Sequence, residues 1–212
     1  MMLPIADIEN VLFDVAEALR TPVLIAALLC LAVVLVEFGR FLVELSRRRG
    51  RGYAGLQAAT DEALAALTTQ RNLGAAAASL EKVSPSREMS EAIERIVVQY
   101  DRPDRDEQAA KALADFDFGA MRKLERTRAL VRLGPALGLM GTLIPLSPAL
   151  AGLANGDVQQ LSDNLRVAFS VTVLGLLIGA VAFVISLVRD RLYGQDLSDL
   201  QFVAGKLLGP RP

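Results

Sequence analysis

Two long apolar runs, joined by a short acidic segment, fill residues 133–188. Small residues recur through both runs at alternating steps of four and three, which stacks each set along one face of a helix. The first set is Gly134, Gly138, Gly141, Pro145, Pro148 and Gly152, and the second is Ala168, Thr172, Gly175, Gly179, Ala182 and Ser186. Lipid gives apolar helices no hydrophobic drive to associate, so faces that permit close backbone contact provide the adhesion. The pattern predicts a membrane helix hairpin in which the five glycines Gly134, Gly138, Gly141, Gly175 and Gly179 are packing residues.

The composition places the whole chain in the same class. A mean hydropathy of +0.37 is high for a soluble domain, while 22% charged residues is ordinary, so the charges must be segregated along the chain. A bilayer core about 30 Å thick needs roughly 20 residues of helix to cross it. The segments 22–45, 132–154 and 166–188 are long and apolar enough, and the acidic stretch before the first marks it as a retained span rather than a cleaved signal. We therefore predict an all-α membrane protein with three transmembrane helices.

Lysines and arginines gather at one end of each predicted span, and such residues favour the cytoplasmic side. Residues 1–21 carry Arg20 alone, and residues 155–165 carry none. The basic residues that flank the spans are Arg47, Arg48, Arg49, Arg51, Arg122, Lys123, Arg126, Arg128, Arg132, Arg189 and Arg191. The N-terminus is thus predicted outside and the C-terminus in the cytoplasm, with 155–165 as a short external turn.

The segments outside the spans also have helical patterns. We predict a cytoplasmic helical region over 46–131, whose last helix starts near residue 104 and continues into the second span, and a cytoplasmic helical tail over 189–212 that stays helical to about Leu208. The helical positions are Leu56, Ala63, Leu64 and Leu67, then residues 72–80, then Met89, Ile93, Ile96, Val97 and Tyr100, with Ser84 or Ser86 as a cap. Because alanine-rich helices enclose little core, we expect long helices that extend the transmembrane bundle and pack against neighbouring subunits.

Residues 1–21 are predicted to hold an external amphipathic helix. Its apolar face comprises Ile5, Ile8, Leu12, Val15 and Leu19. The opposite face is acidic and lacks the lysines typical of helices that bind membrane surfaces. We expect this helix to dock against its own bundle.

The residue inventory argues against catalysis and against cofactors. The chain has no histidine and one cysteine, Cys30, so it lacks the ligand sets of zinc, haem and iron–sulfur sites and cannot form an internal disulfide. It has no nucleophile–base pair and no phosphate-binding loop, so we predict no enzyme activity. A net charge of −1 gives no reason to expect nucleic acid as a partner.

Both apolar runs of the hairpin carry a familiar motif. The run LGPALGLMGT over 133–142 resembles the second-span signature P-x-L-G-L-x-G-T of the MotA/TolQ/ExbB proton-channel family. The run AFSVTVLGL over 168–176 resembles the third-span signature A-L-x-x-T-x-x-G-L of the same family. The order of one span, a large cytoplasmic insertion and a hairpin agrees as well, although the close match covers only about 125–190.

The resemblance implies a subunit of a motor in the cell inner membrane that is driven by the proton-motive force. Such subunits form homo-oligomers, pentamers in the better-known members, whose second and third spans line a central pore. A single-span dimer of the ExbD, TolR or MotB type inserts there, and its aspartate carries the proton so that force is transmitted across the envelope. ExbB-like members carry a glutamate five residues before the third-span threonine, where this chain has Val167 beside Arg166. The proton-binding acid is therefore expected on the partner.

The spans themselves offer hydroxyls rather than acids. Segments 133–156 and 167–188 contain no ionisable side chain, although intramembrane acids usually mark a proton route. The candidate pore-lining residues are Thr142, Thr172, Ser170, Ser147, Pro145 and Pro148. Rings of hydroxyls could hold water or a protonated carboxyl, and the prolines free backbone carbonyls. The same threonines could instead bond back to their own helix, and the prolines could only kink it.

Other interpretations stay open at this point. A non-conducting scaffold of the same fold would have the same sequence features. A small secondary transporter would fit helices broken by proline, but three spans without an internal repeat argue against it. Glu37, near the cytoplasmic end of the first span, is expected to pair with Arg40 three residues later, which favours a structural role over a proton-carrying one.

Overall fold

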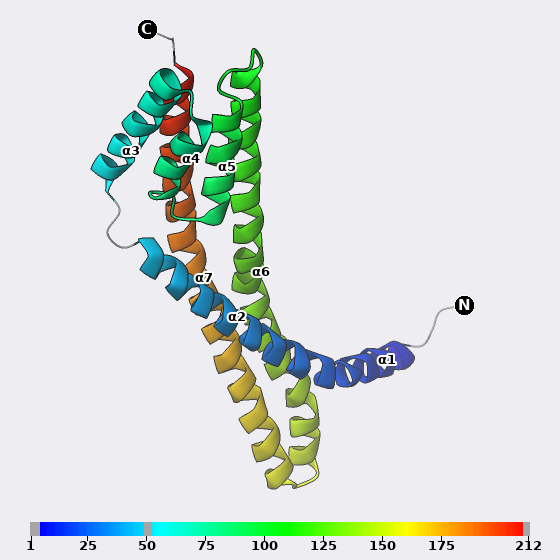
Figure 1. The fold of residues 1–212 in the computed structure, drawn as a ribbon. Helices are drawn as coiled ribbons and strands as arrows, with labels where there is room; N and C mark the ends of the chain where they lie inside the picture. The colour runs from blue at the N-terminus through cyan, green and yellow to red at the C-terminus, as the bar shows by residue number, and fades with distance from the viewer. Residues whose placement is uncertain (1–4, 49–51, 210–212) are drawn as a thin grey trace. The chain divides into compact units, whose positions relative to one another are not determined.

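The computed structural model describes residues 5–48 and 52–209, and within these ranges every regular element is a helix (Figure 1). The elements are α1 (Ile5–Ala18), α2 (Arg20–Arg48), α3 (Tyr53–Ala65), the π-helical turn η1 (Ala66–Gln70), α4 (Leu73–Glu81), α5 (Arg87–Val98), α6 (Arg105–Ala154) and α7 (Val158–Leu208). The predicted all-α fold is confirmed. Arg49 and Arg51 of the predicted basic cluster lie outside the described residues.

Three helices in the described ranges are long and apolar enough to cross a membrane: Asn10–Arg48, α6 and α7. α6 has 50 residues, which at about 1.5 Å per residue is roughly 75 Å and more than twice the bilayer core. It starts at Arg105 and continues through the second apolar segment, as predicted, despite Pro135, Pro145 and Pro148 in its interior. α7 likewise continues beyond its apolar segment and ends at Leu208.

The turn between α6 and α7 is much shorter than the predicted 155–165. It comprises only residues 155–157, because Gly156 takes a left-handed φ of 78° that ends α6, and Asp157 then caps α7. The Asp157 carboxylate accepts a hydrogen bond from the backbone N–H of Gln160 at 2.9 Å. The polar residues after Asp157, which suggested a turn, form the first turns of α7 instead. Polarity alone does not separate a loop from an exposed helical turn.

The chain divides into two compact units, which we describe separately. The first unit comprises the described residues up to Arg40 together with residues 126–186, and the second comprises residues 41–125 and those from Leu187 onward. In the first unit, α2, α6 and α7 meet at a small buried cluster of Val34, Leu130, Ile178 and Ala182. Most other apolar side chains of this unit are exposed, as expected for helices that face lipid or neighbouring subunits.

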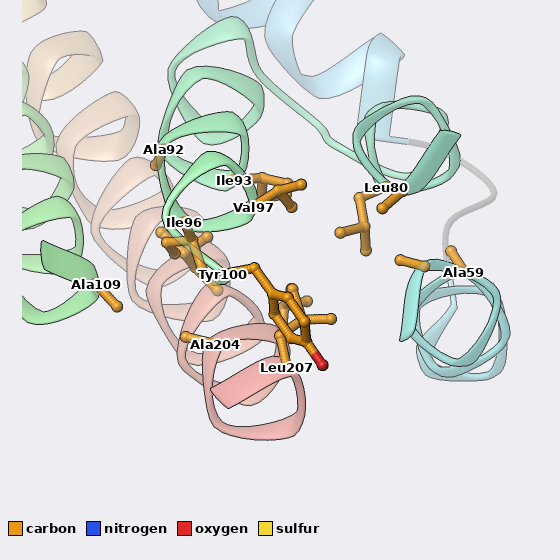
Figure 2. Close-up of a cluster of buried hydrophobic side chains, with 14 of the residues drawn as sticks. Ala59, Leu80, Ala92, Ile93, Ile96, Val97, Tyr100, Ala109, Ala204 and Leu207 are labelled. Carbon is orange, nitrogen blue, oxygen red and sulfur yellow. The ribbon is translucent and has the colours of Figure 1, made fainter. Parts of the chain in front are cut away.

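The second unit has a real hydrophobic core, which corrects the expectation of long helices without one. The short helices α3, η1, α4 and α5 fold onto the start of α6 and the tail of α7, and Figure 2 shows core side chains that come from α3, α4, α5, α6 and α7. The predicted stripe of α5, which comprises Met89, Ile93, Ile96, Val97 and Tyr100, is entirely buried there. The expectation was wrong because the tail of α7 contributes a second apolar stripe, Leu200, Val203, Ala204 and Leu207. Two such stripes bury far more area than alanine-rich helices alone.

Local capping explains how the short helices of this core are separated. Ser86 is the cap of α5, since its hydroxyl accepts from the Met89 N–H at 3.2 Å, whereas the Ser84 hydroxyl donates to the Leu80 carbonyl. Asn72 caps α4 by accepting from the Ala75 N–H at 3.0 Å. The helix predicted around Leu56 to Leu67 is interrupted near its end by the π-helical turn.

The apolar face of the amphipathic N-terminal helix is exposed in the part of the chain that the structure describes. Ile8, Leu12, Val15 and Leu19 are all exposed, so the expected docking is absent within the single chain; the side chain of Ile5 lies outside the described residues. Leu19 alone separates α1 from α2, and its carbonyl accepts from the Val23 N–H at 3.0 Å. Helical hydrogen bonding thus continues across the predicted boundary at residue 21.

Candidate functional site

The glycines of α6 and α7 lie where the two backbones touch. A Cβ atom built on Gly175 would lie 2.5 Å from the carbonyl oxygen of Gly134 and 2.7 Å from the Cα of Gly138. In the other direction, a Cβ on Gly134 would lie 2.8 Å from the backbone nitrogen of Gly179. Real side chains do not tolerate such distances, so this close approach is open only to glycine.

The same contact extends along the hairpin on both sides of these glycines. A Cβ on Gly179 would lie 2.9 Å from the ring of Pro135, and a Cβ on Gly141 would overlap the side chain of Val171. All five glycines singled out from the sequence therefore lie at the contact between α6 and α7. The small face of the third span is turned towards the second span of its own chain.

The candidate hydroxyls differ in their surroundings. Thr142 is half-buried, and its hydroxyl donates to the Leu139 carbonyl at 2.7 Å. The hydroxyl of Thr172 lies 3.1 Å from the carbonyl of Ala168 in its own helix and 3.4 Å from that of Gly138 across the hairpin. Ser170 is exposed and donates to the Arg166 carbonyl at 2.8 Å.

The remaining candidates lie on α6. Pro145 is buried, Pro148 is half-buried and Ser147 is exposed. Thr172 is brought next to Gly138, so the second-span signature run and the third-span signature run are in direct polar contact. The exposed serines lie on outward faces of the hairpin and are not part of this contact.

These bonds determine what the hydroxyls can still do. A threonine hydroxyl has one proton, and in Thr142 and Thr172 that proton points at a backbone carbonyl. The oxygen lone pairs remain as acceptors. Each side chain can therefore receive a hydrogen bond from a donor, such as water or a protonated carboxyl group, without losing its own bond. Among the described residues, no group of three or more His, Cys, Asp or Glu side chains could hold a metal ion.

A polar clamp near the hairpin turn was not foreseen from the sequence. The Arg20 guanidinium donates to the side-chain oxygen of Asn164 at 2.9 Å, and the Asn164 amide donates to the Gln160 carbonyl at 3.0 Å. Asn164 is buried, so the clamp ties the start of α2 to the start of α7. The available signal was a lone arginine before the first span, whereas nothing separated Asn164 from Asn155 in the segment before the third.

Two other places in the first unit bear on the sequence predictions, a groove on α7 and the pair near the end of the first span. An open groove on α7 is lined by Asp163, Arg166, Val167, Ser170 and Val171, which includes the position of the glutamate that ExbB-like sequences have. The predicted pair of Glu37 and Arg40 is present, with 3.4 Å between the carboxylate and the guanidinium.

Comparison with known proteins agrees with the two motifs. A family model described as the MotA/TolQ/ExbB proton channel family matches residues 76–200, more than half of the chain's 212 residues. Among curated proteins, none matches the chain. The family match extends from α4 to the tail of α7 and includes the hairpin in which both signature runs pack on each other. The chain therefore belongs to the MotA/TolQ/ExbB proton channel family.

Proposed function

We propose that this protein is the pore-forming subunit of an inner-membrane motor powered by the proton-motive force. In this proposal several copies, with a pentamer expected, surround a dimer of a single-span, aspartate-bearing protein of the ExbD, TolR or MotB type. The N-terminus lies outside and the C-terminus in the cytoplasm. Membership of a proton channel family supports a channel function for this chain. The motor role, the pentamer, the partner and the orientation are parts of the proposal.

The observation that carries the proposal is the state of the hydroxyls of Thr142 and Thr172. Both hydroxyl protons are engaged with backbone carbonyls, so both oxygens are presented as acceptors. A protonated carboxyl can donate to such an oxygen, whereas an ionised carboxylate can only accept. A lining of this kind favours the neutral form of an aspartate in the membrane and disfavours its charged form. The pore would thus distinguish a loaded carrier from an unloaded one.

The lack of acids in the hairpin also supports a pore in which the partner carries the proton and this chain supplies only neutral polar groups. No ionisable side chain occurs in segments 133–156 and 167–188, and Val167 stands where ExbB-like members have glutamate. A side chain that changes charge must therefore be supplied to the pore by another protein. This requirement matches a partner helix with an aspartate.

Reconstitution tests the proposal directly. The chain is copurified with the product of an adjacent reading frame that encodes one transmembrane helix with an aspartate near its start, and both are placed in vesicles containing a pH-sensitive dye. Proton flux that needs both proteins and is lost when the partner aspartate becomes asparagine supports the motor subunit. A stable complex without flux would favour the alternative, a non-conducting scaffold, and flux from this chain alone would remove the need for a partner's acid.

A further inference from the structure

A network of mostly buried charged side chains lies in the second unit, at the ends of the first and third predicted spans. The Arg48 guanidinium donates to both carboxylate oxygens of Asp196, at 2.7 Å each, in a two-pronged pair. Glu44 accepts from Arg48 at 3.3 Å and from Arg189 at 3.2 Å. Two residues of α2 are thereby joined to two of α7.

The network is mostly buried, with the Glu44 side chain its most exposed member at 21%, and its formal charges cancel. The side chains of Asp196, Arg189 and Arg48 are 4%, 7% and 11% exposed. Charged groups taken out of water to this extent are tolerated only when paired, and the removal of one partner leaves an uncompensated buried charge. Burial raises the pKa of Asp196, against the opposing effect of its bond with Arg48.

Further contacts extend the network to two more helices. Tyr193 lies among these charges on α7, and the Lys123 ammonium of α6 lies 6.0 Å from the centre of its ring. Lys123 also pairs with Glu88 of α5 at 2.6 Å. Apolar packing at the end of α2 comes from Phe41, which is buried, and from Leu45, which is half-buried, whereas Leu42, Val43 and Ser46 are exposed.

Neighbouring arginines show that these positions are special. Arg47 and Arg191 are exposed, whereas Arg48 and Arg189, one and two residues away, are engaged inside the network. From the sequence all four count alike as signals for the cytoplasmic side. The structure divides them into exposed charges and paired ones.

We propose that Glu44, Arg48, Arg189 and Asp196 form a joint that fixes the end of α2 on the tail of α7. Resting on the proposed function, we also propose that proton-driven output requires the joint. Arg48 is then a positioning residue, because its guanidinium bonds to the carboxylates of both Glu44 and Asp196. In this proposal charge pairing adds to the apolar packing of Phe41 and Leu45 in holding the end of α2.

Hydrogen exchange on the full-length protein in lipid nanodiscs tests the joint without any assay of function. Arg48→Gln should speed amide exchange over residues 41–48 about a hundredfold, since a buried carboxylate pair is left short of a cation. The matched control Arg47→Gln should keep the exchange rate of these amides within about twofold of that in the unaltered protein, because Arg47 is an exposed charge. Arg48→Lys, which keeps the charge but loses the fork, should lie between them. Equal amide exchange rates over residues 41–48 in Arg48→Gln and Arg47→Gln would rule out the proposed joint.

A paired removal separates charge pairing from a general loss of packing. In the double variant Arg48→Leu, Asp196→Leu the remaining charges, Glu44 and Arg189, still cancel, so exchange should return towards that of the unaltered protein. Exchange as fast as in Arg48→Gln would show that pairing is not what holds α2. The half-buried Asp199, changed to asparagine, controls for charge loss on the same helix.

Vesicles that contain the partner then test the second half of the proposal. Where the unaltered protein conducts, Arg48→Gln should reduce proton flux at least about tenfold at equal oligomer content, and the double variant should regain most of it. Unchanged flux with fast exchange would overturn the link to output but not the joint. Absence of flux from the unaltered protein would count against the proposed function, and the exchange comparison alone then decides the joint.

Discussion

At the scale of single residues, the hydroxyls of Thr142 and Thr172 can be tested by a change that keeps their shape. Valine in place of threonine removes the acceptor oxygen and leaves the volume nearly constant. Loss of one membrane hydrogen bond costs only about 0.6 kcal/mol, so insertion and assembly should persist. Proton flux in vesicles that contain both proteins should fall about tenfold for each change. This is the loss expected if the partner's protonated carboxyl loses one hydrogen bond to the threonine oxygen, worth about 1.4 kcal/mol.

The double variant Thr142→Val, Thr172→Val provides the decisive comparison. Near-normal flux at normal assembly would assign both hydroxyls to packing, through their bonds to Leu139, Ala168 and Gly138. The exposed Ser147, changed to alanine, shows how much a hydroxyl outside the hairpin contact contributes.

Glu88 gives a pH-dependent prediction at the same scale. Burial by itself would raise its pKa, but the bond and charge of Lys123, together with hydrogen bonds from the backbone and from Ser86, outweigh this, so the pKa lies below the ordinary 4.5. A carboxyl whose pKa is lower in the folded state contributes stability above its unfolded pKa and loses it as the pH falls through the folded value. Since both side chains are about half exposed, the contribution at pH 7 should be only about 0.2–1 kcal/mol.

The measurement is chemical denaturation in detergent at neutral and at strongly acidic pH. Glu88→Gln should be less stable than the unaltered protein at pH 7, and this difference should vanish once Glu88 is protonated. The exposed Glu94, changed to glutamine, is the control. A difference that persists unchanged below the folded pKa would show that the pair with Lys123 is not its source.

At the scale of elements, the contact between α6 and α7 depends on glycine. Gly175→Leu places a side chain where a Cβ alone would lie 2.5 Å from the Gly134 carbonyl, so the helices must separate. We expect the hairpin to lose at least about 1–3 kcal/mol, and the oligomer built on it to dissociate more readily. Thermal unfolding and native mass spectrometry in detergent measure the two effects.

Leu177→Phe is the matched control on the same helix, because Leu177 is exposed in the single chain. It should leave both stability and oligomer mass nearly unchanged. Gly179→Leu should behave like Gly175→Leu, since Gly179 packs on the ring of Pro135. An intact, equally stable oligomer for both glycine variants would contradict the close contact of the two helices.

At the scale of the whole molecule, the basic residues predict the orientation in the membrane. In a Cys30→Ala background, a cysteine at Asn155, in the turn after α6, should react with an impermeant thiol reagent added outside intact cells. A cysteine at Gln195, an exposed position on the tail of α7, should react only after permeabilisation. The reverse pattern would reject the orientation and with it the proposed motor.

The sequence by itself determined the helical class, the three apolar segments and the hairpin. Each follows from period and composition, which act within one segment: steps of four and three align the glycines, and about 20 apolar residues suffice to span a bilayer. The same local patterns predicted the continuous α6 and the buried stripe of α5. The family motifs were readable for the same reason, because each is contained in ten residues or fewer.

Only the tertiary structure decided which surfaces meet. The core of the second unit joins α5 to the tail of α7, about 100 residues later, and neither stripe indicates its partner. The arginines at 47 and 48 are identical in type, yet one is exposed and the other is paired with Asp196, because a turn of 100° per residue points them in different directions. The burial of a charge is a property of the assembled helices, since only a partner brought close in space can compensate its loss of hydration.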